Sequence, residues 1–207
     1  MNKISKLFSL AASAATLLFF SASVQAAPEL GAVAPQFTMI DTNGNEVSTS
    51  DLVGKTVVLE WTNHGCPFVQ KHYDSGNMQA LQSEATGDDI VWLSIISSAE
   101  GKQGSVNAEE ANQLTEDRNA APSHVLLDAE GVVGKAYDAR TTPHMFIIDP
   151  DGKVAYMGGI DDNPSANPAD IEGAQNYVRT ALSEMKDGKA VSTPASRPYG
   201  CNVKYAS

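Results

Sequence analysis

The chain has 207 residues, of which 42% are hydrophobic, and its formal net charge at pH 7 is −11. This length is sufficient for one domain with a substantial core. The excess of acidic residues argues against nucleic acid or an anionic membrane as a partner. No Gly-x-Ser-x-Gly sequence occurs, so the chain lacks the nucleophile motif of the common serine hydrolases.

The first 26 residues have the pattern of a secretory signal peptide. Lys3 and Lys6 precede an apolar run over residues 7–20, and Val24-Gln25-Ala26 is a small-x-small cleavage sequence. The apolar run is short for a membrane span. We therefore expect an exported protein, in the bacterial periplasm, that is free of the membrane once residues 1–26 are removed.

The remaining chain alternates between extended and helical patterns. Extended segments are predicted at 36–41, 46–48, 56–61, 90–96, 124–128, 144–149 and 154–158, and a loop at 97–107. Helices are predicted directly after Cys66, with an interruption at Gly76, and then at 109–119 and 132–139. Asn43-Gly44 and Pro150-Asp151-Gly152 are typical hairpin turns. This alternation predicts an α/β sheet with helices packed on it.

A final helix is predicted from Pro168 to Gly188, with Asn167 as its N-cap. Its apolar residues fall on one face at helical spacing: Ile171, Ala174, Val178, Ala181, Leu182 and Met185. After Gly188 a tail continues to residue 207. Its second cysteine, Cys201, lies between Tyr199 and Tyr205, which could anchor the tail by burying aromatic area.

Cys66 lies where the strand 56–61 gives way to a helix. The unpaired N–H groups and positive partial charge of a helix N-terminus favour a thiolate over a thiol. His64 and His72 could add to this effect if protonated. Cys66 is therefore interpreted as a reactive thiol, and the alternative is an inert buried cysteine.

The order of features along the chain resembles the thioredoxin fold. It consists of Cys66 after the first central strand, then Thr142-Pro143, and then a hairpin and a helix. More narrowly, the chain resembles exported redoxins of the peroxiredoxin-like AhpC/TSA (thiol-specific antioxidant) group over residues 27–188. The N-terminal part of the chain resembles the start of such domains at three places: Ala34-Pro35-Gln36-Phe37, the Asn43-Gly44 hairpin and the stretch 50–55. The resemblance implies a central mixed sheet flanked by helices, with an N-terminal β-hairpin extension. It also separates the domain, 27–188, from the tail, 189–207.

The resemblance implies roles for particular residues. Pro143 would be cis and lie against Cys66, and Glu60 would be a buried acid that transfers protons. A buried carboxylate should have a raised pKa, unless a nearby Lys pairs with it or it reaches water. Supporting positions near the thiol are Thr62, Asn63, His64, Thr142 and Arg140. The chain departs from these families in having Val69 where thioredoxins have a second cysteine, Asn63 where peroxiredoxins have Thr, and no Arg closer to Pro143 than Arg140.

Three functions are consistent with these residues. In the first, an enzyme without a cofactor, Cys66 attacks a peroxide or a protein disulfide and Cys201 resolves the product, as C-terminal cysteines do in peroxiredoxins. Its thiol electron donor and its oligomeric state are open. In the second, a non-catalytic module, Cys66 and Cys201 form a structural disulfide. A third idea, a metal site made by Cys66 with His64, His72 or His144, lacks the usual ligand spacing, and no metal is expected.

Overall fold

The computed structural model describes residues 27–206, so the signal peptide predicted at 1–26 lies outside the described part of the chain. The strands are β1 (Thr38–Ile40), β2 (Glu46–Ser48), β3 (Val57–Trp61), β4 (Val91–Ile96), β5 (His124–Leu127), β6 (Thr141–Thr142), β7 (His144–Ile148), β8 (Val154–Gly158) and β9 (Cys201–Asn202). The helices are α1 (Pro67–Asp74), α2 (Asn77–Gly87), α3 (Ala108–Asp117), α4 (Val132–Ala136) and α5 (Tyr177–Lys186), with 3-10 turns η1 (Thr49–Leu52) and η2 (Pro168–Ile171). Within residues 27–206, no helix has the length and apolar character needed to cross a bilayer.

The centre of the molecule is a five-stranded mixed sheet in the order β5-β4-β3-β7-β8. Strands β5, β4 and β3 are parallel, whereas β7 runs antiparallel to β3 and to β8. Strand β3 is therefore central, and all five of its residues are buried. An apolar strand enclosed on both faces is the expected result of its near-continuous hydrophobic sequence.

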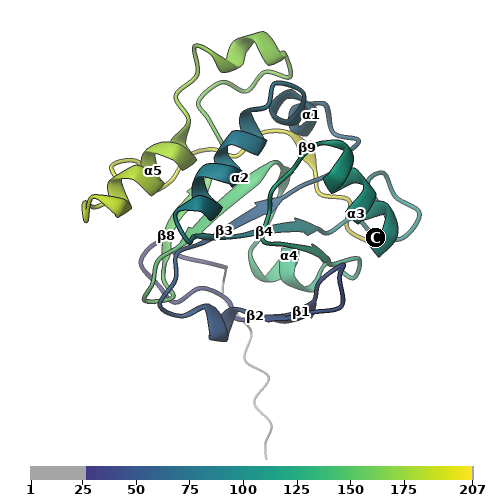
Figure 1. Cartoon of the computed structure of the whole chain (residues 1–207), viewed down its shortest axis with the longest axis horizontal. Coiled ribbons are helices and arrows are strands. Elements are labelled where there is room, and N and C mark those ends of the chain that lie inside the picture. The colour runs from purple at the N-terminus through teal and green to yellow at the C-terminus, as the bar shows by residue number, and fades with distance from the viewer. Residues whose placement is uncertain (1–26, 207) are drawn as a thin grey trace, which may run out of the picture.

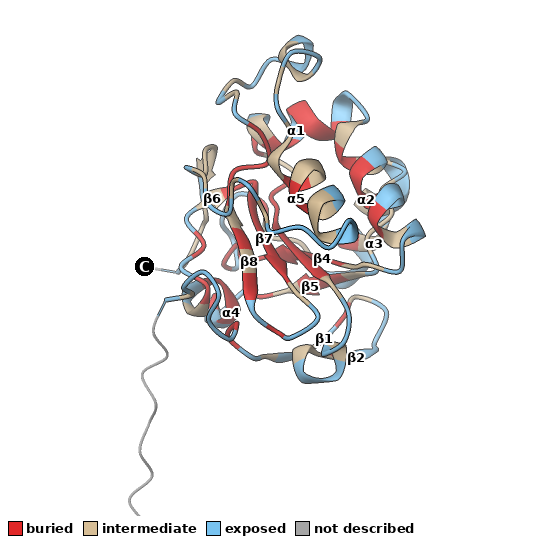
Figure 2. Cartoon of the chain, turned by 90° about the vertical axis from the view of Figure 1, so that its left-hand side faces the viewer, coloured by how far each residue is buried: buried red, intermediate tan, exposed pale blue. Residues whose placement is uncertain are grey.

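Helices cover both faces of this sheet (Figure 1). Helices α1, α2 and α5 pack on the face that carries Val58 and Trp92, and α3 packs on the same side against β5. Helix α4 and the β1–β2 hairpin cover the opposite face, which carries Leu59 and Trp61. The buried residues accordingly concentrate in the central strands and in the helix surfaces turned toward them (Figure 2). The expected mixed sheet, flanked by helices and preceded by a hairpin, is confirmed.

One helical prediction is confirmed and another is wrong. The interruption expected at Gly76 is present: this residue has a φ of 74°, which glycine adopts without a steric penalty, and it separates α1 from α2. The continuous helix predicted from Pro168 to Gly188 is wrong. The chain makes only the short turn η2 there and starts α5 afresh at Tyr177, because Asn176 caps the new helix by accepting a hydrogen bond from the N–H of Arg179.

The tail returns across the end of the sheet instead of hanging free. It is the yellow segment that runs from α5 to the C-terminus in Figure 1. The backbone of Ser196 donates to Met157 of β8, that of Val203 donates to Arg140, and the carbonyl of Lys204 accepts from Ala99. Tyr205 adds a side-chain hydrogen bond to the Ala139 carbonyl. These contacts bring Cys201 back to the region of Cys66.

Candidate active site

Cys66 is the N-cap of α1, and Pro67 follows as the first helical residue. The turn that precedes it is held by Asn63, whose side-chain oxygen accepts from the N–H of Gly65 at 2.9 Å and whose carbonyl accepts from the N–H of Cys66 at 3.0 Å. The amide nitrogen of Asn63 also donates to the carbonyl of Gln103 at 3.1 Å. Asn63 thus fixes the point at which β3 ends and the thiol is presented.

The loop before β7 lies against this thiol. The Thr142-Pro143 peptide bond is cis, as the family resemblance implied. The Cys66 sulfur donates to the Thr142 carbonyl at 3.1 Å, and Cys66 has no exposed surface. The structure therefore brings Thr142, Pro143 and Cys66 together.

Cys201 completes the site from the other side of the loop. In the short β6–β9 ladder it pairs directly with Thr142, so it lies beside Cys66, although the two cysteines are free thiols here. Gly200 makes this approach possible, because a Cβ at this position would lie 2.1 Å from the Thr142 oxygen. Its φ of 134° is also one that side chains other than glycine rarely adopt.

The pKa values of the two thiols are shifted in opposite directions. Burial alone would raise the pKa of Cys66, but hydrogen bonds from the side chains of Cys201 and Thr142, and from the backbone N–H groups of Cys201 and Val69, outweigh it and lower that pKa. Burial raises the pKa of Cys201, and the hydrogen bond to Cys66 raises it further. Cys66 is consequently the better thiolate of the pair, and Cys201 is the better proton carrier.

Glu60 is fully buried in β3, on the sheet face that α1 and α2 cover. Four neutral groups donate to its carboxylate at 2.9 to 3.1 Å: the hydroxyls of Tyr73 and Ser94, the amide of Gln82 and the indole of Trp92. No lysine is among these four donors, so the lysine pairing considered from the sequence is not what the structure shows. The four donors compensate the burial of this acid.

The remaining predicted positions have varied surroundings. The hydroxyl of Thr62 and Nδ1 of His64 have no hydrogen-bond partner within residues 27–206, and both residues line a cavity of about 40 Å³ together with Tyr73 and Arg118. The Arg140 side chain is 71% exposed and pairs with Asp138 at the surface, so it points away from buried Cys66.

The histidines do not supply positive charge to the thiol. Burial lowers the pKa of His64 and that of His72, the latter to about 4, so the suggested assistance by protonated histidines is not supported. Burial lowers the pKa of His144 to about 4 as well. Across the described residues, 27–206, no group of three or more His, Cys, Asp or Glu side chains is arranged to hold a metal ion.

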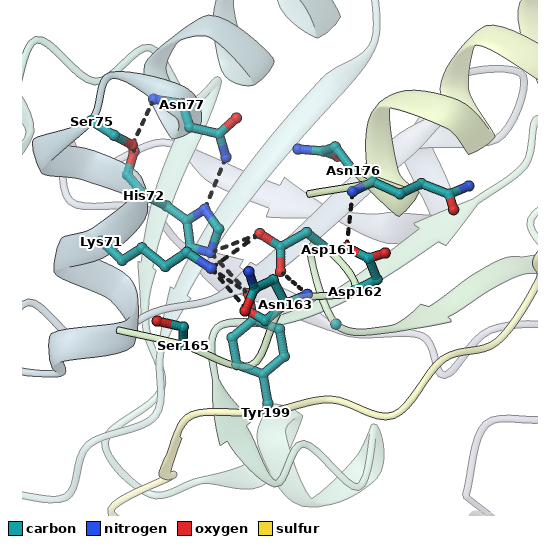
Figure 3. Close-up of polar contacts among 12 residues, drawn as sticks. Lys71, His72, Ser75, Asn77, Asp161, Asp162, Asn163, Ser165, Asn176 and Tyr199 are labelled. Atoms are coloured by element: carbon teal, nitrogen blue, oxygen red, sulfur yellow. Dashed lines mark hydrogen bonds and ion pairs between the residues drawn. The ribbon is translucent and has the colours of Figure 1, made fainter. Parts of the chain in front are cut away.

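Sequence reasoning missed a second polar cluster near the thiols. Lys71 and His72 of α1 meet Asp161 from the segment after β8 and Tyr199 from the tail (Figure 3). The one signal in the sequence was the position of Lys71 and His72, which follow the apolar pair Phe68 and Val69 in a short helix. Their partners lie about 90 and 127 residues away along the chain, beyond any local pattern.

The fold is shared with other solved structures. An uncharacterized conserved protein from Geobacillus kaustophilus has a TM-score of 0.74 and 26% identity, over 86% of this chain and 93% of that one. A protein described as a candidate thiol:disulfide interchange protein DsbE, from Chlorobium tepidum, has a TM-score of 0.51 and 21% identity, over 63% of this chain and 85% of that one. With a cysteine at a helix start beside a cis-proline, this likeness defines the class: the protein is a thioredoxin-fold redoxin.

Sequence comparison gives the family. The chain belongs to the AhpC/TSA family, which matches residues 30–157. The thiol-disulfide oxidoreductase ResA of Bacillus subtilis (strain 168) is 30% identical over 127 residues, which are 61% of this chain and 65% of ResA. The alignment thus spans slightly less than two thirds of that relative. Cys201 lies outside the family match, so the second thiol is a feature that the tail adds.

Proposed function

We propose that the protein is a thiol-dependent oxidoreductase in which Cys66 and Cys201 form a redox-active pair. The observation that carries this proposal is the contact between two free thiols at a helix N-terminus, one with a lowered pKa and the other with a raised pKa. The lowered pKa increases the thiolate fraction of Cys66 and also makes Cys66 a better leaving group. The raised pKa of Cys201 keeps it protonated until its attack is required.

The first candidate reaction is thiol–disulfide exchange. The Cys66 thiolate attacks one sulfur of a substrate disulfide, which forms a mixed disulfide and releases one substrate thiolate. Cys201 then loses its proton and attacks the Cys66 sulfur, which forms the Cys66–Cys201 disulfide and releases the second substrate thiol. The substrate gains two electrons, the pair loses two, and a thiol donor later returns them. The name of the relative ResA supports this class of substrate.

The second candidate substrate is a peroxide. Complete burial of Cys66 favours a small oxidant, and the AhpC/TSA match supports it. The thiolate would attack one peroxide oxygen, giving a sulfenic acid and releasing the alcohol or water. Cys201 would then condense with the sulfenic acid to give the same disulfide and water.

A stopped-flow experiment separates these candidates. The reduced protein is mixed with hydrogen peroxide or with a protein disulfide, and the rate at which the oxidant is consumed is compared between the wild type and the Cys66→Ser variant. A fast second-order reaction with one substrate identifies it, and Cys66→Ser should be inert yet folded. Full activity of Cys66→Ser would overturn the proposal.

A structural Cys66–Cys201 disulfide is the alternative to a catalytic one. After reduction, a catalytic pair should react quickly with a thiol probe at mildly acidic pH, whereas a structural pair should release two slow thiols of ordinary pKa. Peptide mapping of the oxidised protein without reductant should find Cys66 joined to Cys201, and gel migration should show that the link is within one chain. Two free thiols after oxidation would contradict the pairing.

Export to the periplasm is part of the same proposal. The basic, apolar and small-residue regions of residues 1–26 support it, and an oxidising compartment supports a cycling disulfide. N-terminal sequencing of the protein recovered from a periplasmic extract should begin at Ala27. Recovery of the uncleaved chain from the cytoplasm alone would contradict export.

A further inference from the structure

A cluster of four polar side chains, three of them buried and one half-buried, lies beside the thiol pair, and the proposed reaction does not use it. Its members are Lys71, His72, Asp161 and Tyr199, drawn in Figure 3. The side chains of Lys71 and His72 are 0% exposed and that of Asp161 is 2% exposed. Groups of this kind are costly to bury unless neighbours satisfy them, so each contact within the cluster ties together the segments that supply it.

Tyr199 is the member that the tail supplies. Its hydroxyl donates to the Asp161 carboxylate, and its oxygen lies 3.2 Å from Nε2 of His72 and 3.5 Å from Nζ of Lys71. The side-chain amide of Asn77 lies 2.9 Å from Nδ1 of His72. That contact leaves the proton on Nε2, which donates to Tyr199. The lysine ammonium also pairs with Asp161 at 3.3 Å, so the tail is hydrogen-bonded to a closed network.

The same tyrosine touches the helix that begins at Cys66. The Tyr199 ring packs edge-on against Phe68, with centroids 5.9 Å apart, and Nζ of Lys71 lies 5.5 Å from the ring centroid. Tyr199 is also only two residues before Cys201. We propose that Tyr199 is a positioning residue that holds the Cys201 thiol against Cys66 for their reaction. This inference rests on the proposed redox pairing of the two cysteines.

On this side of Cys201 the tail is held to β8 at Ser196, and Tyr199 is an anchor that lies nearer to Cys201. Strand β9 has only two residues, and Gly200, which joins Tyr199 to Cys201, has a freely adaptable backbone. On the other side, the chain is already held by the hydrogen bonds of Val203 and Tyr205. Without Tyr199, rotation of the backbone at Gly200 would let Cys201 move, and Cys201 would spend less time in contact with Cys66. The rate of an intramolecular step falls with that fraction of time.

The inference predicts an effect on one step of the reaction. With oxidised glutathione as the probe, the Cys66 thiolate first forms a mixed disulfide and releases one glutathione. Cys201 then loses its proton and attacks the Cys66 sulfur, which releases the second glutathione; the cysteine pair is oxidised by two electrons and the probe is reduced by two. Only the second step uses Cys201 as a nucleophile, whereas the first step depends on Cys201 only through its hydrogen bond to Cys66, which affects how much thiolate is present. When rates are expressed per Cys66 thiolate, Tyr199 should therefore act on the second step alone.

The test is a single-turnover experiment on Tyr199→Phe, which keeps the ring on Phe68 and removes the hydroxyl from the cluster. Reduced protein is mixed with oxidised glutathione and quenched with acid, and mass spectrometry follows the mixed and the intrachain disulfides. We expect an unchanged first-step rate per Cys66 thiolate, a second step slowed by about tenfold, and accumulation of the mixed disulfide. A loss of stability alone would not slow the second step selectively.

Tyr177→Phe is the matched control, because it removes a hydroxyl from α5 outside the cluster and should leave both steps unchanged. Thermal unfolding checks that each variant is folded in the assay. If Tyr199→Phe does not fold, Phe68→Leu removes the ring contact and leaves the cluster intact; its second step should slow by about threefold. An unchanged second step in the folded variant overturns the positioning role and leaves the proposed function standing. Failure of the wild-type protein to form an intrachain disulfide overturns the proposed function itself.

Discussion

Cys201 lies directly opposite Thr142 in the β6–β9 ladder, and the carbonyl of the same Thr142 accepts a hydrogen bond from the Cys66 thiol. One residue of the cis-proline loop therefore contacts both cysteines. The tail closes over the site at this point, because β9 pairs with a strand whose last residue precedes Pro143. The second thiol is thus placed by backbone pairing from the C-terminal end of the chain, 135 positions after Cys66, and not by a neighbouring position in α1.

Removal of the second thiol should make Cys66 less acidic. Burial opposes the Cys66 thiolate, and the hydrogen bond from Cys201 is the first of the contacts that lower its pKa. In Cys201→Ala that donor is absent, so the pKa of Cys66 should rise. A titration of thiolate ultraviolet absorbance measures this, with Cys66→Ala in parallel to assign the signal. An unchanged midpoint would show that helix α1 and Thr142 alone set the acidity.

Replacement of Glu60 by Gln should slow turnover at neutral pH more than at alkaline pH, where proton removal needs less assistance. The fold should tolerate the change, at a cost of about 1 kcal/mol, because the Gln oxygen can accept from Trp92 and Ser94 while its amide donates to Tyr73. The measurement is turnover against pH, together with chemical unfolding. Ser94→Ala is the control, since it removes one donor and keeps the acid. An equal loss of rate at every pH would indicate a structural role for Glu60.

A methyl group at residue 200 should push the tail from the cis-proline loop. In Gly200→Ala the added Cβ would lie 2.1 Å from the Thr142 carbonyl oxygen, on a backbone with a φ of 134°. We expect a loss of about 2 kcal/mol in the free energy of unfolding and slower formation of the Cys66–Cys201 disulfide. Gly188→Ala is the control, because a Cβ there meets nothing within 4 Å although its φ is also positive. Equal effects of the two changes would mean that backbone strain, and not the contact with Thr142, is responsible.

The free energy of unfolding should fall as the pH decreases from about 6.5 to about 4. Burial lowers the folded-state pKa of His72 and His144 to about 4, whereas both have a pKa near 6.5 when unfolded. Below pH 6.5 the unfolded chain therefore binds protons that the folded chain does not, and each histidine destabilises the fold by up to roughly 1.4 kcal/mol per pH unit. Because the folded pKa is lowered, this stabilisation is complete above pH 6.5 and is lost toward pH 4.

Urea unfolding at a series of pH values tests this dependence. His144→Asn should reduce the slope by up to roughly 1.4 kcal/mol per pH unit, and it should fold because its side-chain oxygen can replace Nδ1 as the acceptor of the Arg140 N–H. A slope that is the same in His144→Asn and wild type would show that His144 is protonated in the folded protein.

Local sequence was sufficient for most of the site on the Cys66 side. The strand 56–61, the break at Gly65 and Pro67 predicted a helix directly after Cys66, and this helix is confirmed because helix starts depend on neighbouring residues. The cis bond before Pro143 was expected only through the family resemblance, since trans is the usual state of an X-Pro bond. The final helix was overextended, because the capping of α5 by Asn176 competes with an apolar pattern that continues across Gly173.

By itself, the sequence determined most of the order of strands and helices, the buried central strand and the position of Cys66 directly before a helix. Each of these depends on residues within a few positions of one another, where periodicity and capping act. Only the tertiary structure decided that Cys201 meets Cys66, that four neutral donors surround Glu60, and that Tyr199 joins Lys71 and Asp161. These contacts join residues between 13 and 135 positions apart, and they form only after the sheet and its helices have fixed where the tail can lie.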